Sequence, residues 1–233
     1  MIMTKKPRWK AEEVKEFCGW DFLMRMVEQA DSPRLKLLIA AGFSTGARIN
    51  ETLKLEAKHF DFNLDPNMVV VRAMPVIKRY EKIGQTTKWK CIGHCKMRWG
   101  SAQRQREPTE IERSRHNILE YQGWVTRPKE AYRTFPFPKT EPLVKTLQEL
   151  LPANGKLFSV GYSTAYNELT NLGQSMGTWI PTHWFRAQRA SQLAFEYGFS
   201  EHELIEWFLW RDYMTAFNYA RKGYKGLAAK MVK

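Results

Sequence analysis

A helical apolar pattern at both ends of the chain, separated by a long polar stretch, restricts the fold more than any other feature of the sequence. Between positions 11 and 29, apolar residues recur at the spacing of an amphipathic helix. A second helix is predicted from Ser32, an N-cap residue followed by proline. Gly42 and Gly46 are expected to interrupt it before a short third helix over 49–55.

The apolar pattern is again helical from residue 141 to the end of the chain. Helices are predicted there by spacing and by their glycine and proline breaks, over 141–151, 162–173, 184–197, 200–209 and 212–221. Between the two helical parts, strands are predicted at 68–72 and 76–80, and prolines keep 133–138 extended. The order indicates an α+β fold that is mainly helical with a small sheet.

The middle of the chain, at about 81–127, is polar and has little periodicity. From Lys78 to Arg106 there are nine Lys or Arg residues and a single acidic residue, Glu81. Blocks of this kind are usually solvated loops or nucleic-acid contacts, so we expect a basic insertion here.

The charge of the whole chain favours a polyanionic partner. The 233 residues carry a formal net charge of +13, and nucleic acid is the commonest polyanion that such a surface binds. A basic protein with no such partner is the alternative. Three cysteines give no disulfide framework, and the sequence contains neither a signal peptide nor an apolar run long enough to span a membrane. We therefore expect a soluble, intracellular protein.

The first candidate site residue is Arg48, in the stretch from residue 42 to 55. It follows two glycines and opens a short helix whose other positions are apolar. A charge at the end of a buried helix needs an anionic partner, which would be either a ligand or simply Glu51 three residues later.

A second pair, His183 and Arg186, lies at the start of a predicted helix. The spacing of three residues places both side chains on one face. Unpaired backbone N–H groups and the positive end of the helix dipole would favour a phosphate there. A capped helix with an ordinary surface pair is the alternative.

A third candidate is Tyr219, near the C-terminus. Basic residues surround it in sequence: Arg211, Arg221, Lys222 and Lys225. A tyrosine nucleophile needs positive charges of this kind, because the reference pKa of the phenol is about 10. Taken alone, Tyr219 could equally be a packing residue.

Together these motifs resemble the catalytic domain of the tyrosine recombinase, or phage integrase, superfamily. The chain has a T-G-x-R-x-x-E box at 45–51, an H-x-x-R box at 183–186, and a leucine-rich turn with Trp210 nine residues before Tyr219. It departs from the family pattern at Leu209, where glycine is usual, and Trp210 replaces the more common histidine. The match covers nearly the whole chain and implies a small antiparallel sheet among helices. An archaeal or mobile-element integrase is the kind of member we expect.

The resemblance also implies roles for these residues in cutting and rejoining duplex DNA. Tyr219 would attack a backbone phosphate to give a 3′-phosphotyrosyl link and a free 5′-hydroxyl. Arg48 and Arg186 would clamp the non-bridging oxygens, and His183 would be the general acid–base. Trp210 would supply packing and one N–H donor. The family chemistry needs no metal, no other cofactor and no ATP.

A lysine on a β-hairpin would protonate the leaving 5′-oxygen in this family. The stretch 128–136 resembles the second half of that hairpin, which favours Lys129. Lys78, at the other end of the polar stretch, is the rival.

For the organisation of the chain, we expect a basic arm at 1–10 and a catalytic domain over 11–233 with an insertion at about 81–127. An N-terminal core-binding domain, usual in integrases, is not expected, so the chain is interpreted as a fragment or as a short single-domain form. The resemblance implies double-stranded DNA as partner, a homo-oligomer with a tetrameric synapse, and a cytoplasmic, nucleoid-associated location. A relaxing activity like that of type IB topoisomerases and a non-catalytic DNA-binding protein are the alternatives.

A possible metal site lies within the polar stretch. Cys91, His94, Cys95 and His116 are ligand types that zinc prefers. The spacing matches no standard ribbon or finger, because adjacent His94 and Cys95 would both have to point inward. The sequence therefore favours a reduced, metal-free loop and leaves zinc as the alternative.

Overall fold

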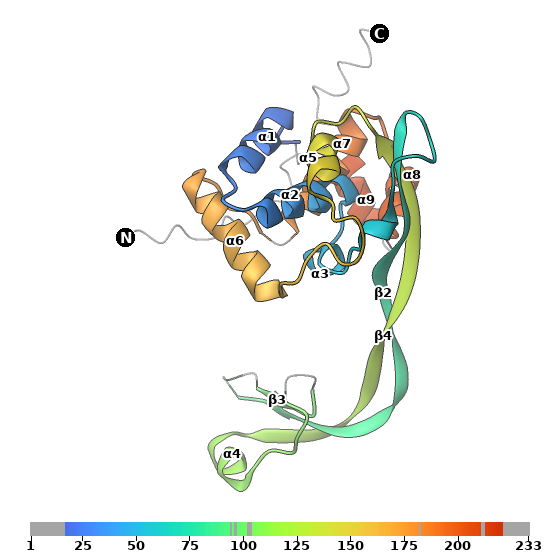
Figure 1. The fold of residues 1–233 in the computed structure, drawn as a ribbon. Helices are drawn as coiled ribbons and strands as arrows, with labels where there is room; N and C mark the ends of the chain where they lie inside the picture. Colours follow the sequence, from blue (N-terminus) through green and yellow to red (C-terminus); the bar gives the residue numbers. More distant parts are fainter. Residues whose placement is uncertain are drawn as a thin grey trace. The chain divides into compact units, whose positions relative to one another are not determined.

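The computed structural model describes residues 17–220, except 94, 96, 102–103, 182 and 211–212, and it leaves out the side chains of 77–81, 126–130, 218 and 220. The chain divides into two compact units (Figure 1). The helical unit comprises 1–76 and 132–233, and the small unit comprises 77–131. The basic arm predicted for 1–10 lies outside the described residues.

The helical unit is built around helix α2 (Pro33–Thr45). This helix packs against α1 (Trp20–Gln29), α5 (Leu143–Leu150) and α7 (Trp184–Phe195) (Figure 1). Its side chains are buried on nearly every face, as the all-round apolar pattern predicts. At its start, Ser32 caps the helix by accepting a hydrogen bond from the Leu35 N–H over 3.2 Å.

One expectation for this helix is wrong, because Gly42 does not interrupt it. The helix continues through Gly42 to Thr45 and ends at Gly46, which has the left-handed φ of 56°. A Cβ at position 42 would lie 3.1 Å from the ring of Phe185. Gly42 therefore allows α7 to approach α2 closely and does not end the helix.

The remaining helices of this unit agree with the sequence pattern to within a few residues. They are α3 (Ile49–Thr52), α6 (Tyr162–Ser175), α8 (Glu201–Phe208) and α9 (Tyr213–Ala220), with α9 packed on α7 and α8. A short 3₁₀ helix, η1 (Ala57–His59), follows α3.

The sheet is centred on a strand longer than the sequence predicts. Strand β2 (Met68–Cys91) pairs antiparallel with β1 (Phe60–Asp61) and β3 (Arg98–Trp99), and also pairs with β4 (Ile118–Pro138). The strands predicted at 68–72 and 76–80 are parts of β2, joined through an irregular turn of backbone at Ala73, where φ is 47°.

The stretch at 81–127, whose composition is typical of solvated loops, is strand rather than loop at its two ends. Residues 82–86 are all exposed, so neither face of this part of β2 is selected to be apolar. A strand without a buried face has no alternating pattern to reveal it. The short helix α4 (Glu110–Arg115) was also missed, although Thr109 and Glu112 form a capping box.

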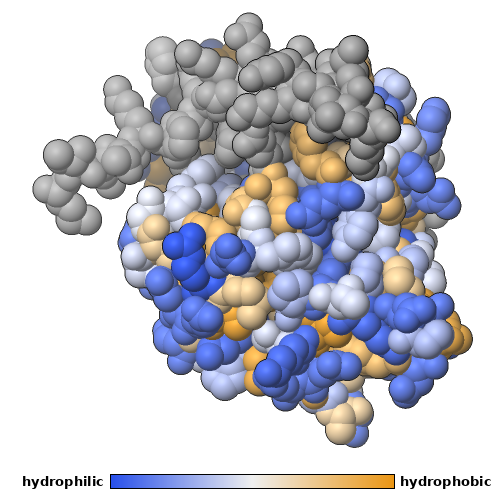
Figure 2. All heavy atoms as spheres, turned by 90° about the horizontal axis from the view of Figure 1, so that it is seen from above, coloured by the Kyte–Doolittle hydropathy of each residue, from blue (hydrophilic) through white to orange (hydrophobic). Residues whose placement is uncertain are grey.

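The predicted class is confirmed: an α+β fold, mainly helical, with small antiparallel sheets. On the face drawn in Figure 2, hydrophilic residues predominate and hydrophobic ones are scattered among them. None of the helices in the described part of the chain has the length and apolar character of a membrane span.

We expect Gly46→Ala to lower the free energy of unfolding by about 2–4 kcal/mol. The new Cβ would add left-handed strain and would lie 2.6 Å from Cε1 of Phe208. Gly155→Ala is the matched control, since φ is 78° there and nothing lies within 4 Å of the added atom. The free energy of unfolding of this control should fall only by the cost of the backbone strain, about 1–2 kcal/mol. Chemical denaturation measures both, and equal losses would show that the Phe208 contact is unimportant.

Candidate active site

Arg48 opens helix α3 beside a buried carboxylate. Its Nη1 donates to Oε1 of Glu51 over 2.9 Å, and its backbone N–H donates to Oε2 over 2.9 Å. Glu51 is buried, whereas the Arg48 side chain is 44% exposed. The ion pair that the sequence left as the structural alternative is therefore present. It also holds an accessible guanidinium in a defined position, where an anion can reach it.

Arg186, on the first turn of α7, is buried and bound by two backbone carbonyls. Its Nη1 donates to the Gly46 oxygen over 3.0 Å, and its Nη2 donates to the Phe208 oxygen over 2.8 Å. The ring of Phe208 lies 4.6 Å from the guanidinium carbon. Burial, followed by the positive charge of Arg48, lowers the pKa of Arg186 to about 10. The group therefore remains charged at neutral pH.

Three aromatic rings form a stack that reaches Tyr219. Phe208 and Trp210 are nearly parallel, with ring centroids 4.6 Å apart, and Trp210 and Tyr219 are nearly parallel at 5.3 Å. The guanidinium carbon of Arg186 lies 5.5 Å from the Trp210 ring. The charge of Tyr219 in its ionised form is also close enough to act on the pKa of Arg186. The stack thus brings Tyr219 on α9 next to Arg186 on α7.

Leu209, between two members of this stack, occupies the position where glycine is usual in the superfamily that the sequence resembles. It has a left-handed backbone with φ of 52°, the conformation that glycine adopts without strain. The turn geometry is therefore kept at a cost of about 1 kcal/mol or more for the leucine.

His183 lies at the N-terminus of α7 and is exposed. Partial burial and then the guanidinium groups of Arg48 and Arg186 lower the pKa of its imidazole. Since the reference value is about 6.5, the ring is neutral at pH 7 and can accept a proton. Because both guanidinium groups act on the pKa of His183, the histidine lies within electrostatic range of Arg48 and Arg186.

Arg133, on β4, is a buried residue of the site that sequence reasoning missed as such. It is 5% exposed, its Nη1 donates to the Trp207 carbonyl over 2.5 Å, and its Nη2 donates to the Thr45 carbonyl. Burial, then the charge of Arg186, holds its pKa well below the usual range. An arginine among aromatic residues in an extended segment was the signal that could have found it.

The two candidate lysines lie on paired strands, Lys78 on β2 and Lys129 on β4. Their side chains are outside the described residues, as are Arg211, Arg221, Lys222 and Lys225. The preference for Lys129 over Lys78 therefore remains a prediction.

Ring contacts join Arg186, Trp210 and Tyr219, and Arg48 and His183 lie within electrostatic range of Arg186. The fold that holds them is a tyrosine recombinase fold, as the comparison with solved structures shows.

Two solved structures of the XerH site-specific recombinase have this fold. The complex with difH substrate before cleavage has a TM-score of 0.52 and 15% identity, over 91% of this chain and 51% of the XerH chain. The complex with palindromic difH substrate after cleavage has a TM-score of 0.54 and 16% identity, over 94% of this chain and 53% of the XerH chain. This chain therefore spans about half the length of the XerH chains.

The catalytic domain of bacteriophage HP1 integrase aligns over 94% of each chain with 15% identity, but its TM-score of 0.49 is too low to carry an inference. No family model and no curated protein matches the sequence.

We expect the imidazole of His183 to titrate below about 6.5, and Arg48→Ala to raise its pKa. The guanidinium of Arg48 disfavours the imidazolium, so removing it must shift the pKa upward. NMR titration of the histidine ring protons, assigned with His183→Asn, measures the shift. An unchanged pKa in Arg48→Ala would place the two groups out of electrostatic range, and Arg34→Ala on α2 provides the control.

Proposed function

We propose that this chain is the catalytic domain of a site-specific recombinase that cleaves and rejoins duplex DNA, with Tyr219 as nucleophile. The observation that supports this most is the meeting of a tyrosine, two arginines and a neutral histidine, drawn from three separate stretches of the sequence, in one region. The fold likeness to recombinases solved with their DNA substrates supports it further.

In the proposed reaction, the Tyr219 Oη attacks a backbone phosphorus and the bond from phosphorus to the 5′-oxygen breaks. A 3′-phosphotyrosyl bond forms, and the leaving 5′-oxygen takes up a proton to become a hydroxyl. The energy of the broken phosphodiester is kept in the new ester, so attack by a 5′-hydroxyl reverses the step without ATP.

The two arginines would stabilise the negative charge that develops on the non-bridging oxygens. Their positions suit this role because neither has to be ordered by the substrate: two carbonyls hold Arg186, and Glu51 holds Arg48. Donors already in position cost no reorganisation during the reaction, and each such contact is typically worth a factor of about 10²–10³ in rate.

His183 and Trp210 would serve the nucleophile. A neutral imidazole at pH 7 can accept the phenol proton as Tyr219 attacks, and return a proton on rejoining. Trp210 would orient the Tyr219 ring through the stack and supply its indole N–H to the phosphate.

The small unit would add sequence-independent contacts to DNA. Its residues 77–131 include thirteen Lys or Arg and six Asp or Glu. Lys82 lies 4.4 Å from the Trp124 ring and Lys90 lies 5.7 Å from the Tyr121 ring. Contacts of basic side chains with phosphates position a duplex and do not read its sequence.

As in other recombinases, we propose that copies of the chain assemble on DNA, with a tetrameric synapse.

We expect Tyr219→Phe to abolish the covalent adduct on a nicked suicide substrate while DNA affinity changes less than about threefold, because one hydroxyl contributes little to binding. Tyr213→Phe is the matched control, since Tyr213 is 48% exposed and lies against His202, not Trp210. Denaturing gels score the adduct, and mass spectrometry identifies the modified residue. An adduct that persists in Tyr219→Phe would exclude Tyr219 as the nucleophile.

The leaving-group acid can be identified with a 5′-thiol substrate. We expect Lys129→Ala to lose cleavage of the ordinary substrate and to regain it with the 5′-bridging sulfur, because a thiolate leaves without a proton. Lys78→Ala should respond equally to both substrates. If the 5′-thiol substrate instead restored cleavage by Lys78→Ala, Lys78 and not Lys129 would be the leaving-group acid.

A further inference from the structure

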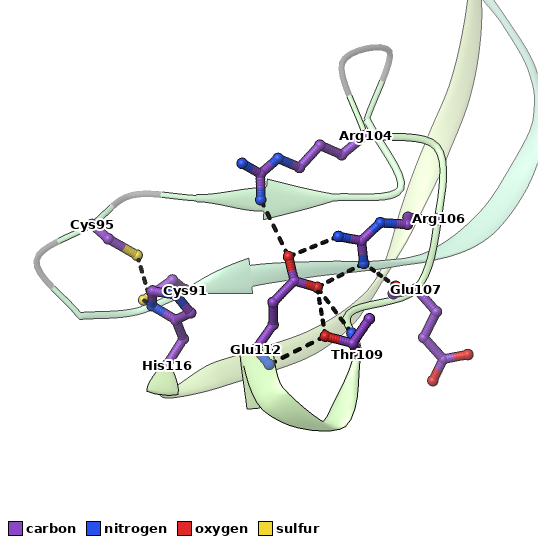
Figure 3. Close-up of polar contacts among 8 residues, drawn as sticks. All are labelled: Cys91, Cys95, Arg104, Arg106, Glu107, Thr109, Glu112 and His116. Carbon is purple, nitrogen blue, oxygen red and sulfur yellow. Dashed lines mark hydrogen bonds and ion pairs between the residues drawn. The ribbon is translucent and has the colours of Figure 1, made fainter. Parts of the chain in front are cut away.

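Two cysteines and a histidine meet in the small unit, which contains none of the five residues of the candidate active site. Cys91 ends β2, Cys95 lies in the following loop, and His116 caps the C-terminus of α4. Nδ1 of His116 lies 3.3 Å from Sγ of Cys95 and 4.0 Å from Sγ of Cys91, and all three atoms lie within 4.8 Å of one another. Figure 3 shows the three side chains pointing toward one point.

We propose that these three residues bind one zinc ion through two thiolates and one imidazole. Zinc–sulfur bonds of about 2.3 Å and zinc–nitrogen bonds of about 2.0–2.1 Å place neighbouring tetrahedral ligand atoms about 3.6–3.8 Å apart. The observed separations of 3.3 and 4.0 Å lie on either side of that value. Small movements of the side chains are therefore enough to form the site.

The chemistry of the three donors selects zinc. Thiolate and imidazole ligands suit zinc, whereas magnesium and calcium require oxygen ligands. A tetrahedral ion takes a fourth ligand, and water supplies it in open sites. His94 lies outside the described residues and is not part of the proposed set.

The groups around the three donors also suit a metal centre. The N–H of Gly93 donates to the Cys91 sulfur over 3.3 Å, a contact that stabilises a thiolate ligand. The ring of His116 lies 5.9 Å from that of Trp99, and its backbone N–H donates to the Glu112 carbonyl over 3.0 Å. The imidazole is thus positioned by α4 and by a buried tryptophan before any ion binds.

The small unit also needs the stability that a structural metal supplies. Among its described residues, Cys91 and Trp99 are the buried hydrophobic ones. Units of this size with so little apolar core commonly depend on a disulfide or a metal. A zinc ion here would join the end of β2, the loop after it and α4.

A neighbouring ion-pair cluster already ties α4 to the segment before it. Glu112 binds Arg106 over 2.6 Å and Arg104 over 3.4 Å, and it accepts from the backbone N–H of Thr109 (Figure 3). This cluster fixes the start of α4, and the metal would fix its end. The ion-pair cluster and the proposed zinc site therefore stabilise opposite ends of α4.

The test begins with the wild-type chain purified in reductant and without chelator, then dialysed against zinc chloride. We expect one zinc per chain by elemental analysis. After replacement of zinc by cobalt, we expect thiolate-to-cobalt charge-transfer absorption and the visible bands of tetrahedral cobalt. A chain that takes up no zinc, or a cobalt spectrum without thiolate bands, would overturn the proposal without any variant.

The variants Cys91→Ser, Cys95→Ser and His116→Ala should each weaken zinc binding at least tenfold, as measured by competition with a chromophoric chelator. Cys18→Ser is the matched control, because Cys18 belongs to the helical unit and should leave the affinity unchanged. Chelation should also speed proteolysis within 77–131, and zinc should restore protection. Unchanged affinity in Cys95→Ser and His116→Ala would identify surface-bound zinc and refute the site, as would a Cys91–Cys95 disulfide that persists in reductant.

Discussion

Buried arginines that bind backbone carbonyls are the interaction on which the candidate site depends. Arg133 joins the carbonyls of Thr45 and Trp207, and Arg186 joins those of the next residue in each segment, Gly46 and Phe208. The loop before Arg48 and the end of α8 before Trp210 are therefore held together twice. If either arginine were lost, two carbonyls would lose their donor and the two segments would keep only one of these links.

A buried guanidinium bound only by carbonyls lowers the folding stability, but it places a positive charge inside the protein. Removing a guanidinium from water costs several kcal/mol, and carbonyl acceptors offset this less completely than a carboxylate does. Nearby Arg189 has the more usual solution, a buried ion pair with Glu141 at 2.7 Å. The contrast fits the proposed function, in which Arg133 and Arg186 would concentrate positive charge near a bound phosphate at the expense of folding stability.

The sequence predicted the fold class and most helices, because buried helices such as α2 and α7 carry strong apolar periodicity. It failed where a residue's role depends on a distant partner. Gly42 resembles a helix break until Phe185 is placed against it, and Arg133 resembles a surface charge until two carbonyls surround it. The exposed parts of β2 and β4 had no pattern to detect. The candidate site residues could be named from the sequence because short motifs contain them, whereas the spacing of Cys91, Cys95 and His116 matches no standard zinc motif and gave no sign that the three side chains converge.

The way in which the small unit joins the helical unit has an architectural consequence. Both crossings between the units occur within β2 and β4, which pair with each other, so the two chain ends left by removing 77–131 belong to adjacent strands. Adjacent strands are only about 4.8 Å apart, a gap that a two-residue turn closes. The unit is thus a module that could be added to or deleted from a hairpin tip while every helix of the helical unit kept its neighbours.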